Sequence, residues 1–111
     1  MAQNFRRYKE SAIGTSATDI RKGSNFDSYD TIVGISLANI LTTTINVDVY
    51  IANGGTNYYL VKTAPIPSGG ALQVLDGGAK VVVESGDRLY IKSDTASSVD
   101  AWVSAVDAIS T

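Results

Sequence analysis

The sequence of 111 residues contains no cysteine and no histidine. Without cysteine the chain has no disulfide, no thiolate nucleophile and no cysteine-ligated zinc. The absence of histidine removes the commonest general base and the commonest ligand for transition metals. From these two absences we expect no enzymatic activity, no cofactor and no metal site.

The remaining polar residues offer no replacement for that chemistry. A serine nucleophile needs an activating base, and no Ser-x-x-Lys sequence is present to supply a lysine for this role. Asp76 and Asp87 flank glycine turns, but nothing sets the separation that a glycosidase pair requires. No EF-hand spacing surrounds Asp94 or Asp100, so calcium is not expected either.

The chain also lacks a long apolar run. No stretch approaches the roughly 18 consecutive apolar residues of a membrane-spanning helix, and the segment MAQNFRRYKE has no apolar core of a signal peptide. The net charge of −2 does not favour nucleic acid as a partner of the whole domain. We therefore expect neither a membrane nor nucleic acid as partner, and synthesis in a cytoplasm without classical secretion.

Basic residues are concentrated near the N-terminus. Five of the nine basic residues and two of the eleven acidic residues lie in the first 22 positions, so this segment carries +3 and the remainder −5. Residues 1–16 lack periodicity, and we expect an extended arm there in front of a domain over 17–111. The arm is either a solvated terminus or a basic segment that docks onto an acidic neighbour, another copy of the chain included.

Hydrophobic residues make up 44% of the chain, enough for one core at this length. The clearest strand covers 45–52, where apolar residues alternate with polar ones at the period of a half-buried antiparallel strand. Turn signals separate it from its neighbours at intervals of about 10 residues, as in a sandwich. The other expected strands cover 17–22, 31–40, 57–64, 71–75, 80–84, 88–93 and 99–109. The sequence thus predicts a single all-β antiparallel sandwich of seven or eight strands, of jelly-roll or immunoglobulin-like type.

The inward positions of these strands define an expected core. It consists of Val33, Ile35, Leu37, Ile45, Val47, Val49, Ile51, Leu72, Val74, Val81, Val83, Leu89, Ile91 and Val103.

Four aromatic residues outside this core have three possible roles: cross-strand packing, a subunit interface or a sugar-binding surface. They are Tyr50, Tyr58, Tyr59 and Trp102. Tyr50 and Trp102 lie opposite the apolar sets of their own strands, so they are the better interface candidates. The full set of candidate partner-binding residues joins these aromatics to the arm. It consists of Phe5, Arg6, Arg7, Tyr8, Lys9, Tyr50, Tyr58, Tyr59 and Trp102.

Four short segments of the sequence combine turns and strands in a distinctive way: ISLAN (35–39), VDVYI (47–51), PIPSGGAL (65–72) and VESGDRL (83–89). In these segments the chain resembles small structural proteins of tailed-bacteriophage virions, especially those of cyanophages and other marine phages. The resemblance covers roughly residues 17–110, and its motifs are turns that lead into strands.

The resemblance implies a non-enzymatic virion component with a β-sandwich fold, present in many copies and made in the host cytoplasm. Its partners would be other virion proteins and copies of itself, bound through the arm, a strand edge or an aromatic face. The basic arm favours a capsid cement or decoration protein. A neck, head–tail connector or tail component is the alternative, and a carbohydrate-binding host-recognition module is an alternative of another class.

Overall fold

The computed structural model describes residues 4–20, 30–75, 81–83 and 86–107, and within these ranges the chain forms nine β-strands and no helix. The strands are β1 (Asn4–Ile13), β2 (Thr18–Asp19), β3 (Asp30–Asn39), β4 (Ile45–Asn53), β5 (Thr56–Ile66), β6 (Ala71–Gln73), β7 (Val81–Val83), β8 (Arg88–Ser93) and β9 (Val99–Asp107).

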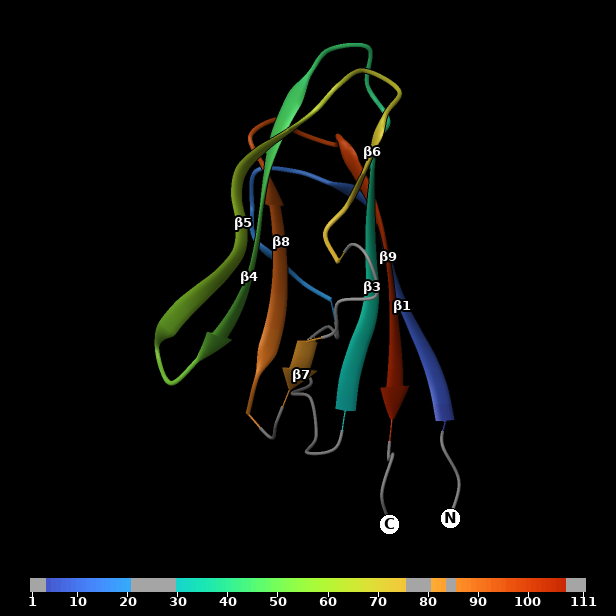
Figure 1. Cartoon of the computed structure of the whole chain (residues 1–111). Helices are drawn as coiled ribbons and strands as arrows, with labels where there is room; N and C mark the ends of the chain where they lie inside the picture. The colour runs from blue at the N-terminus through green and yellow to red at the C-terminus, as the bar shows by residue number, and fades with distance from the viewer. Residues whose placement is uncertain (1–3, 21–29, 76–80, 84–85, 108–111) are drawn as a thin grey trace.

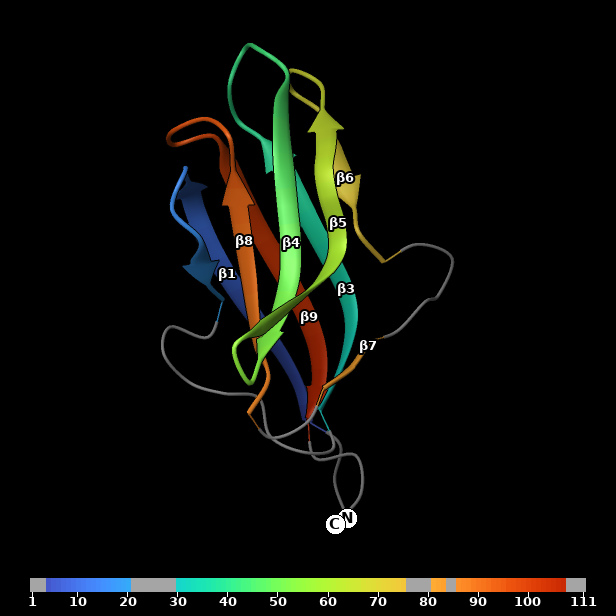
Figure 2. The same cartoon turned by 90° about the vertical axis from the view of Figure 1, so that its left-hand side faces the viewer.

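The strands form two antiparallel sheets that pack face to face (Figure 1). One has the order β1-β9-β3-β6, with β7 also paired to β3, and the other has the order β2-β8-β4-β5. Figure 2 looks onto the second sheet, with β8, β4 and β5 in front of β1, β9 and β3. The predicted all-β sandwich is therefore confirmed, with one strand more than the seven or eight expected.

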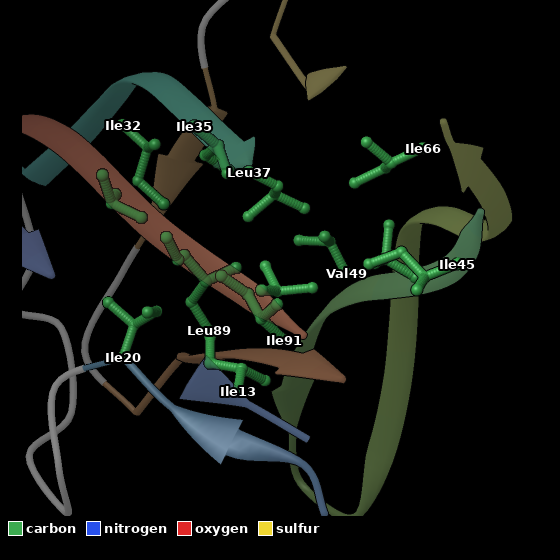
Figure 3. Packing of buried hydrophobic residues seen from close by; sticks show 14 of the residues in the cluster. Ile13, Ile20, Ile32, Ile35, Leu37, Ile45, Val49, Ile66, Leu89 and Ile91 are labelled. Carbon is green, nitrogen blue, oxygen red and sulfur yellow. The ribbon is translucent and has the colours of Figure 1, made fainter. Parts of the chain in front are cut away.

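The hydrophobic core lies between the sheets, where side chains from both inner faces meet (Figure 3). In β4 every second residue from Ile45 to Val49 is fully buried, and the residues between are half-buried, as the period of two predicted. Ile13, Ile20, Ile32 and Ile66 are buried as well, although the expected core did not contain them.

One member of the expected core is wrong, and the cause is a β-bulge. Val33 is 36% exposed, whereas Ile32 is fully buried. The β3–β9 register shifts between Ile32 and Gly34. The extra residue of this bulge shifts the inward–outward alternation by one position, so that Ile32 points inward and Val33 outward. Four other expected members, Ile51, Leu72, Val74 and Val81, are only partly buried but pack against the core. The other nine are fully buried.

The expected extended arm over 1–16, separate from a domain over 17–111, also needs correction. Its residues Asn4–Ile13 form β1, which pairs with β9 along the edge of the five-stranded sheet. Tyr8 and Ile13 face inward and contact the core, which holds the strand in place although its other side chains are mostly polar. The N-terminal basic residues are therefore carried on a strand of the sandwich.

The end of β5 differs from expectation in a smaller way. The sequence predicted a strand over 57–64, yet β5 continues through Pro65 to Ile66. β5 lies at the edge of its sheet, where a residue without an N–H group is tolerated. Asp76 lies outside the described residues, as do residues 21–22, 80, 84 and 108–109 of the expected strands.

Candidate functional site: two outer faces

The outer face of the five-stranded sheet carries an exposed tryptophan beside two cations. Trp102 lies on β9 between Ala101 and Val103, which are buried, so its own side chain points outward and is 49% exposed. The guanidinium carbon of Arg7 lies 5.3 Å from the centre of the indole ring, within the range of a cation–π interaction. Lys9 is paired with Trp102 across the β1–β9 ladder and is exposed.

The opposite side of Trp102 has only small neighbours. On β3 the outward positions next to β9 are Gly34, Ser36 and Ala38, none of which has a side chain longer than that of serine. Gln73 of β6 reaches this row and donates a hydrogen bond from Nε2 to Ser36 Oγ at 3.1 Å. The indole of Trp102 therefore projects above small side chains on the β3 side and has the cations of Arg7 and Lys9 on the β1 side.

Residues of β1 and β9 border an open hollow of about 400 Å³, lined by Lys9, Glu10, Ser11, Asp100, Ala101 and Trp102. Next to it in sequence β1 has a bulge, where the register shifts between Glu10 and Ile13. Ala12 has a φ of 54° there, and its N–H donates to Asp100 Oδ1 at 2.9 Å. The hollow marks the place at which the regular part of β1 ends.

The outer face of the four-stranded sheet carries a row of three tyrosines from three neighbouring strands. The ring centres of Tyr50 and Tyr90 lie 5.4 Å apart in a stacked arrangement, and those of Tyr50 and Tyr59 lie 5.0 Å apart with a tilt of 45°. Lys62 Nζ lies 4.5 Å from the centre of the Tyr59 ring. The three tyrosine rings therefore contact one another across neighbouring strands, as in cross-strand packing.

Packing within the row changes the acidity of its central member. Burial raises the pKa of the Tyr50 hydroxyl above its ordinary value, and the nearby Tyr59, Tyr90 and Asp48 raise it further. A tyrosine that resists ionisation in this way keeps its hydroxyl group as a hydrogen-bond donor over a wider pH range.

A second open hollow, of about 350 Å³, lies next to the tyrosine row and is lined by residues that include Asp48, Thr63, Lys92 and Asp94. Its carboxylates already serve the fold. Asp94 accepts hydrogen bonds from the Asn46 N–H at 3.1 Å and from Thr95 Oγ1 at 2.9 Å, and these bonds lower the pKa of Asp94. Asp48 Oδ1 accepts the Thr63 N–H at 2.7 Å.

The structure thus divides the residues that the sequence proposed for partner binding. Arg7 and Lys9 come together with Trp102 on one face, although Trp102 is more than 90 positions away from both in sequence. Arg6 is exposed on the same strand. Tyr8, by contrast, packs against the core. The Phe5 backbone pairs with Val106, and its side chain lies outside the described features.

Tyr50 and Tyr59 come together on the other face, and the sequence reasoning missed their third partner, Tyr90. Tyr90 lies between the buried residues Leu89 and Ile91, so the alternation of β8 could have placed it outward. Tyr58 is 60% exposed and pairs with Ile51 near the end of the β4–β5 hairpin, on the side of β5 opposite to Tyr59.

Among the described residues no group of three or more histidine, cysteine, aspartate or glutamate side chains is placed to hold a metal ion. The part of the chain that the structure describes also has no helix long and apolar enough to cross a membrane. No protein-family model and no curated protein significantly matches the chain.

Proposed function

We propose that this chain is a non-enzymatic structural protein of a tailed-phage virion, and specifically a cement or decoration protein of the capsid. The proposal rests on the sequence resemblance and on one structural observation. Trp102 is half exposed and flanked by Arg7 and Lys9 on the outer face of the five-stranded sheet.

This combination fits a protein–protein contact. Tryptophan and arginine are the residues that most often dominate the binding energy of an interface, and they do so where a partner excludes water from them. Arg7 and Lys9 add positive charge at the rim of the patch, which favours an acidic partner surface and speeds the encounter with it. A neighbouring capsid subunit with acidic side chains at its surface would exclude water from Trp102 and would also pair with Arg7 and Lys9.

The particle itself provides the test. We expect the chain in purified virions at a fixed ratio to the major capsid protein, with a tagged copy located on the head by immunogold labelling. Labelling at the neck or tail would instead indicate that the chain is a connector or tail protein that uses the same surface. Absence of the chain from purified particles would refute the virion proposal.

The role of the face is tested with matched variants. Particles that lack the chain are incubated with the purified protein, and binding is followed by co-sedimentation. We expect Trp102→Ala to weaken binding by about tenfold or more, because interface tryptophans commonly contribute 2 kcal/mol or more. Tyr59→Ala is the control, since Tyr59 is similarly exposed but lies on the other face. Equal effects of the two variants would contradict the choice of face.

A further inference from the structure

The edges of the two sheets differ in whether another strand could pair with them. β2 has two residues, and β6 and β7 have three each, so these edges are too short to guide a further strand. The long edges among the described strands are β1, with ten residues, and β5, with eleven. The question is therefore which of these two a partner could use.

The β5 edge is interrupted along its length. Its register against β4 shifts twice, between Val47 and Val49 and between Val49 and Tyr50. Thr63 has a φ of 52°, which a residue other than glycine rarely adopts, and its N–H is bound to Asp48. Pro65 removes a further donor. Bulges and proline are devices that prevent strand addition, so we regard this edge as closed.

The β1 edge is regular over most of its length. Seven consecutive residues, from Asn4 to Glu10, pair with Asp107 to Ala101 without a shift, and the bulge at Ala12 begins only after them. In the order of the sheet β1 is terminal, with β9 on one side and no described strand on the other. A regular terminal strand presents alternate backbone N–H and C=O groups in the pattern that an added strand needs.

The charge on β1 determines what could be added. The strand carries Arg6, Arg7 and Lys9, with Glu10 as the one acidic residue among its described side chains. An antiparallel pair of two β1 strands would place three cations from each copy in one short ribbon, and like charges across a ladder are destabilising. An acidic segment would instead place carboxylates opposite Arg7 and Lys9.

We infer that the edge of β1 that faces away from β9, over residues 4–10, receives an extended acidic segment of a partner protein as an additional antiparallel or parallel strand of the five-stranded sheet. This inference rests on the proposed function and specifies its partner as a segment of about seven residues with acidic side chains. The added strand would lie on the side of β1 away from β9 (Figure 1), so Arg7 and Lys9 of β1 would stand between it and Trp102 of β9.

The edge is tested first without any particle. The probe is an acetylated and amidated octapeptide in which valine alternates with glutamate, and its counterpart contains lysine in place of glutamate. In ¹⁵N-labelled protein we expect the glutamate peptide to shift the amide resonances of residues 4–10, and to bind about tenfold more tightly than the lysine peptide. Equal binding of both peptides, no binding, or shifts centred on 56–66 would overturn the inference.

Charge variants separate the edge from general electrostatics. Arg7→Glu/Lys9→Glu is expected to abolish binding of the glutamate peptide, and Arg7→Gln/Lys9→Gln to weaken it. Lys62→Glu/Lys92→Glu removes the same number of cations from the four-stranded sheet and is expected to leave binding within about twofold of the wild type. Loss of binding in this control as well would show a non-specific charge effect and refute the edge site.

The native partner is tested in the particle by hydrogen–deuterium exchange. We expect residues 4–10 to gain protection when the chain is bound to its particle, with no gain over 56–61 of β5. A particle-bound chain without new protection on β1 overturns the edge inference but leaves the virion role intact. A chain that is absent from particles refutes the virion role, whereas the peptide titration still decides about the edge.

Discussion

The two outer faces of the sandwich expose aromatic side chains to nearly the same degree but use them differently. Trp102 on the five-stranded sheet is 49% exposed, and Tyr59 on the four-stranded sheet is 44% exposed. Tyr59 lies against Tyr50 and Lys62, within a row that extends to Tyr90. Trp102 has Arg7 on one side and only small outward residues on β3.

The difference shows that exposed area alone does not identify a binding face. Aromatic pairs across strands stabilise a sheet, and rings that cover one another leave less apolar surface for a partner. A single large ring above small neighbours has most of its stabilising contacts still available. For this reason our proposal places the partner contact on the five-stranded sheet and gives the tyrosine row a structural role.

The largest expected effect concerns which face of the four-stranded sheet is inward. Val49 is fully buried between the outward residues Asp48 and Tyr50. Val49→Asp places an unpaired carboxylate in the core and costs several kcal/mol, a large part of the usual ~5–15 kcal/mol of stability. We expect loss of the cooperative thermal transition in circular dichroism.

The matched control is on the other sheet. Val82 is 70% exposed on β7, and Val82→Asp is expected to change the free energy of unfolding by no more than about 0.5 kcal/mol. A cooperative melt of Val49→Asp at the wild-type temperature would mean that the inward face has been assigned incorrectly.

The next effect compares the two long edges. Thr63 on β5 and Ala12 on β1 both have a positive φ, and the N–H of each donates to an aspartate of the neighbouring strand, Asp48 or Asp100. Asp48→Ala and Asp100→Ala should each lower the free energy of unfolding by about 1 kcal/mol, because each removes one largely exposed, charge-assisted bond. Urea denaturation measures both values.

A glycine at position 63 distinguishes the loss of the hydrogen bond between Thr63 and Asp48 from the cost of the positive φ of Thr63. Thr63→Gly is expected to recover part of the loss in the Asp48→Ala background, since glycine adopts positive φ without the steric penalty. No recovery would show that the cost of Asp48→Ala does not come from the conformation of Thr63.

Much of this fold could be predicted from the sequence because alternation is a local signal. The period of two in Ile45–Val49 fixed both the strand and its inward side. The bulges could not be predicted, because an extra residue is recognised only against the partner strand, and the one at Ile32–Gly34 reversed the expectation for Val33. The strand β1 was missed for a related reason. It is an edge strand with mostly polar side chains, so the segment shows little apolar periodicity.

The candidate site was predicted residue by residue but not as an arrangement. The sequence placed Trp102 outward and Arg7 and Lys9 on a basic segment, but only the β1–β9 pairing brings them together. The grouping of Tyr50 with Tyr59 and Tyr90 likewise depends on strand order, which periodicity does not contain. Long-range pairing therefore decided which candidates share a surface.

A smaller effect compares the cation–π pairs of the two faces. Arg7 lies 5.3 Å from the Trp102 ring centre, and Lys62 lies 4.5 Å from that of Tyr59. Double-mutant cycles with alanine should give coupling energies of about 0.5–1 kcal/mol for each pair, as for exposed cation–π contacts. A coupling near zero for Arg7 and Trp102 would show that the tryptophan is not oriented by the arginine before a partner binds.

The smallest expected effect is a pH dependence confined to the tyrosine row. Because burial, with Tyr59, Tyr90 and Asp48, raises the pKa of Tyr50 in the folded protein, the unfolded chain releases this proton first as the pH rises. The stabilisation is thus fully present below the unfolded pKa of about 10 and is lost as the pH rises through the folded pKa. Denaturation at a series of alkaline pH values should therefore show a shallower decline for Tyr50→Phe than for the wild type. Tyr59→Phe should fall between them, because it removes one of the neighbours that raise the pKa of Tyr50 and leaves the burial of Tyr50. Identical slopes for all three proteins would contradict a perturbed tyrosine at the centre of the row, and with it the view that this face is packed upon itself.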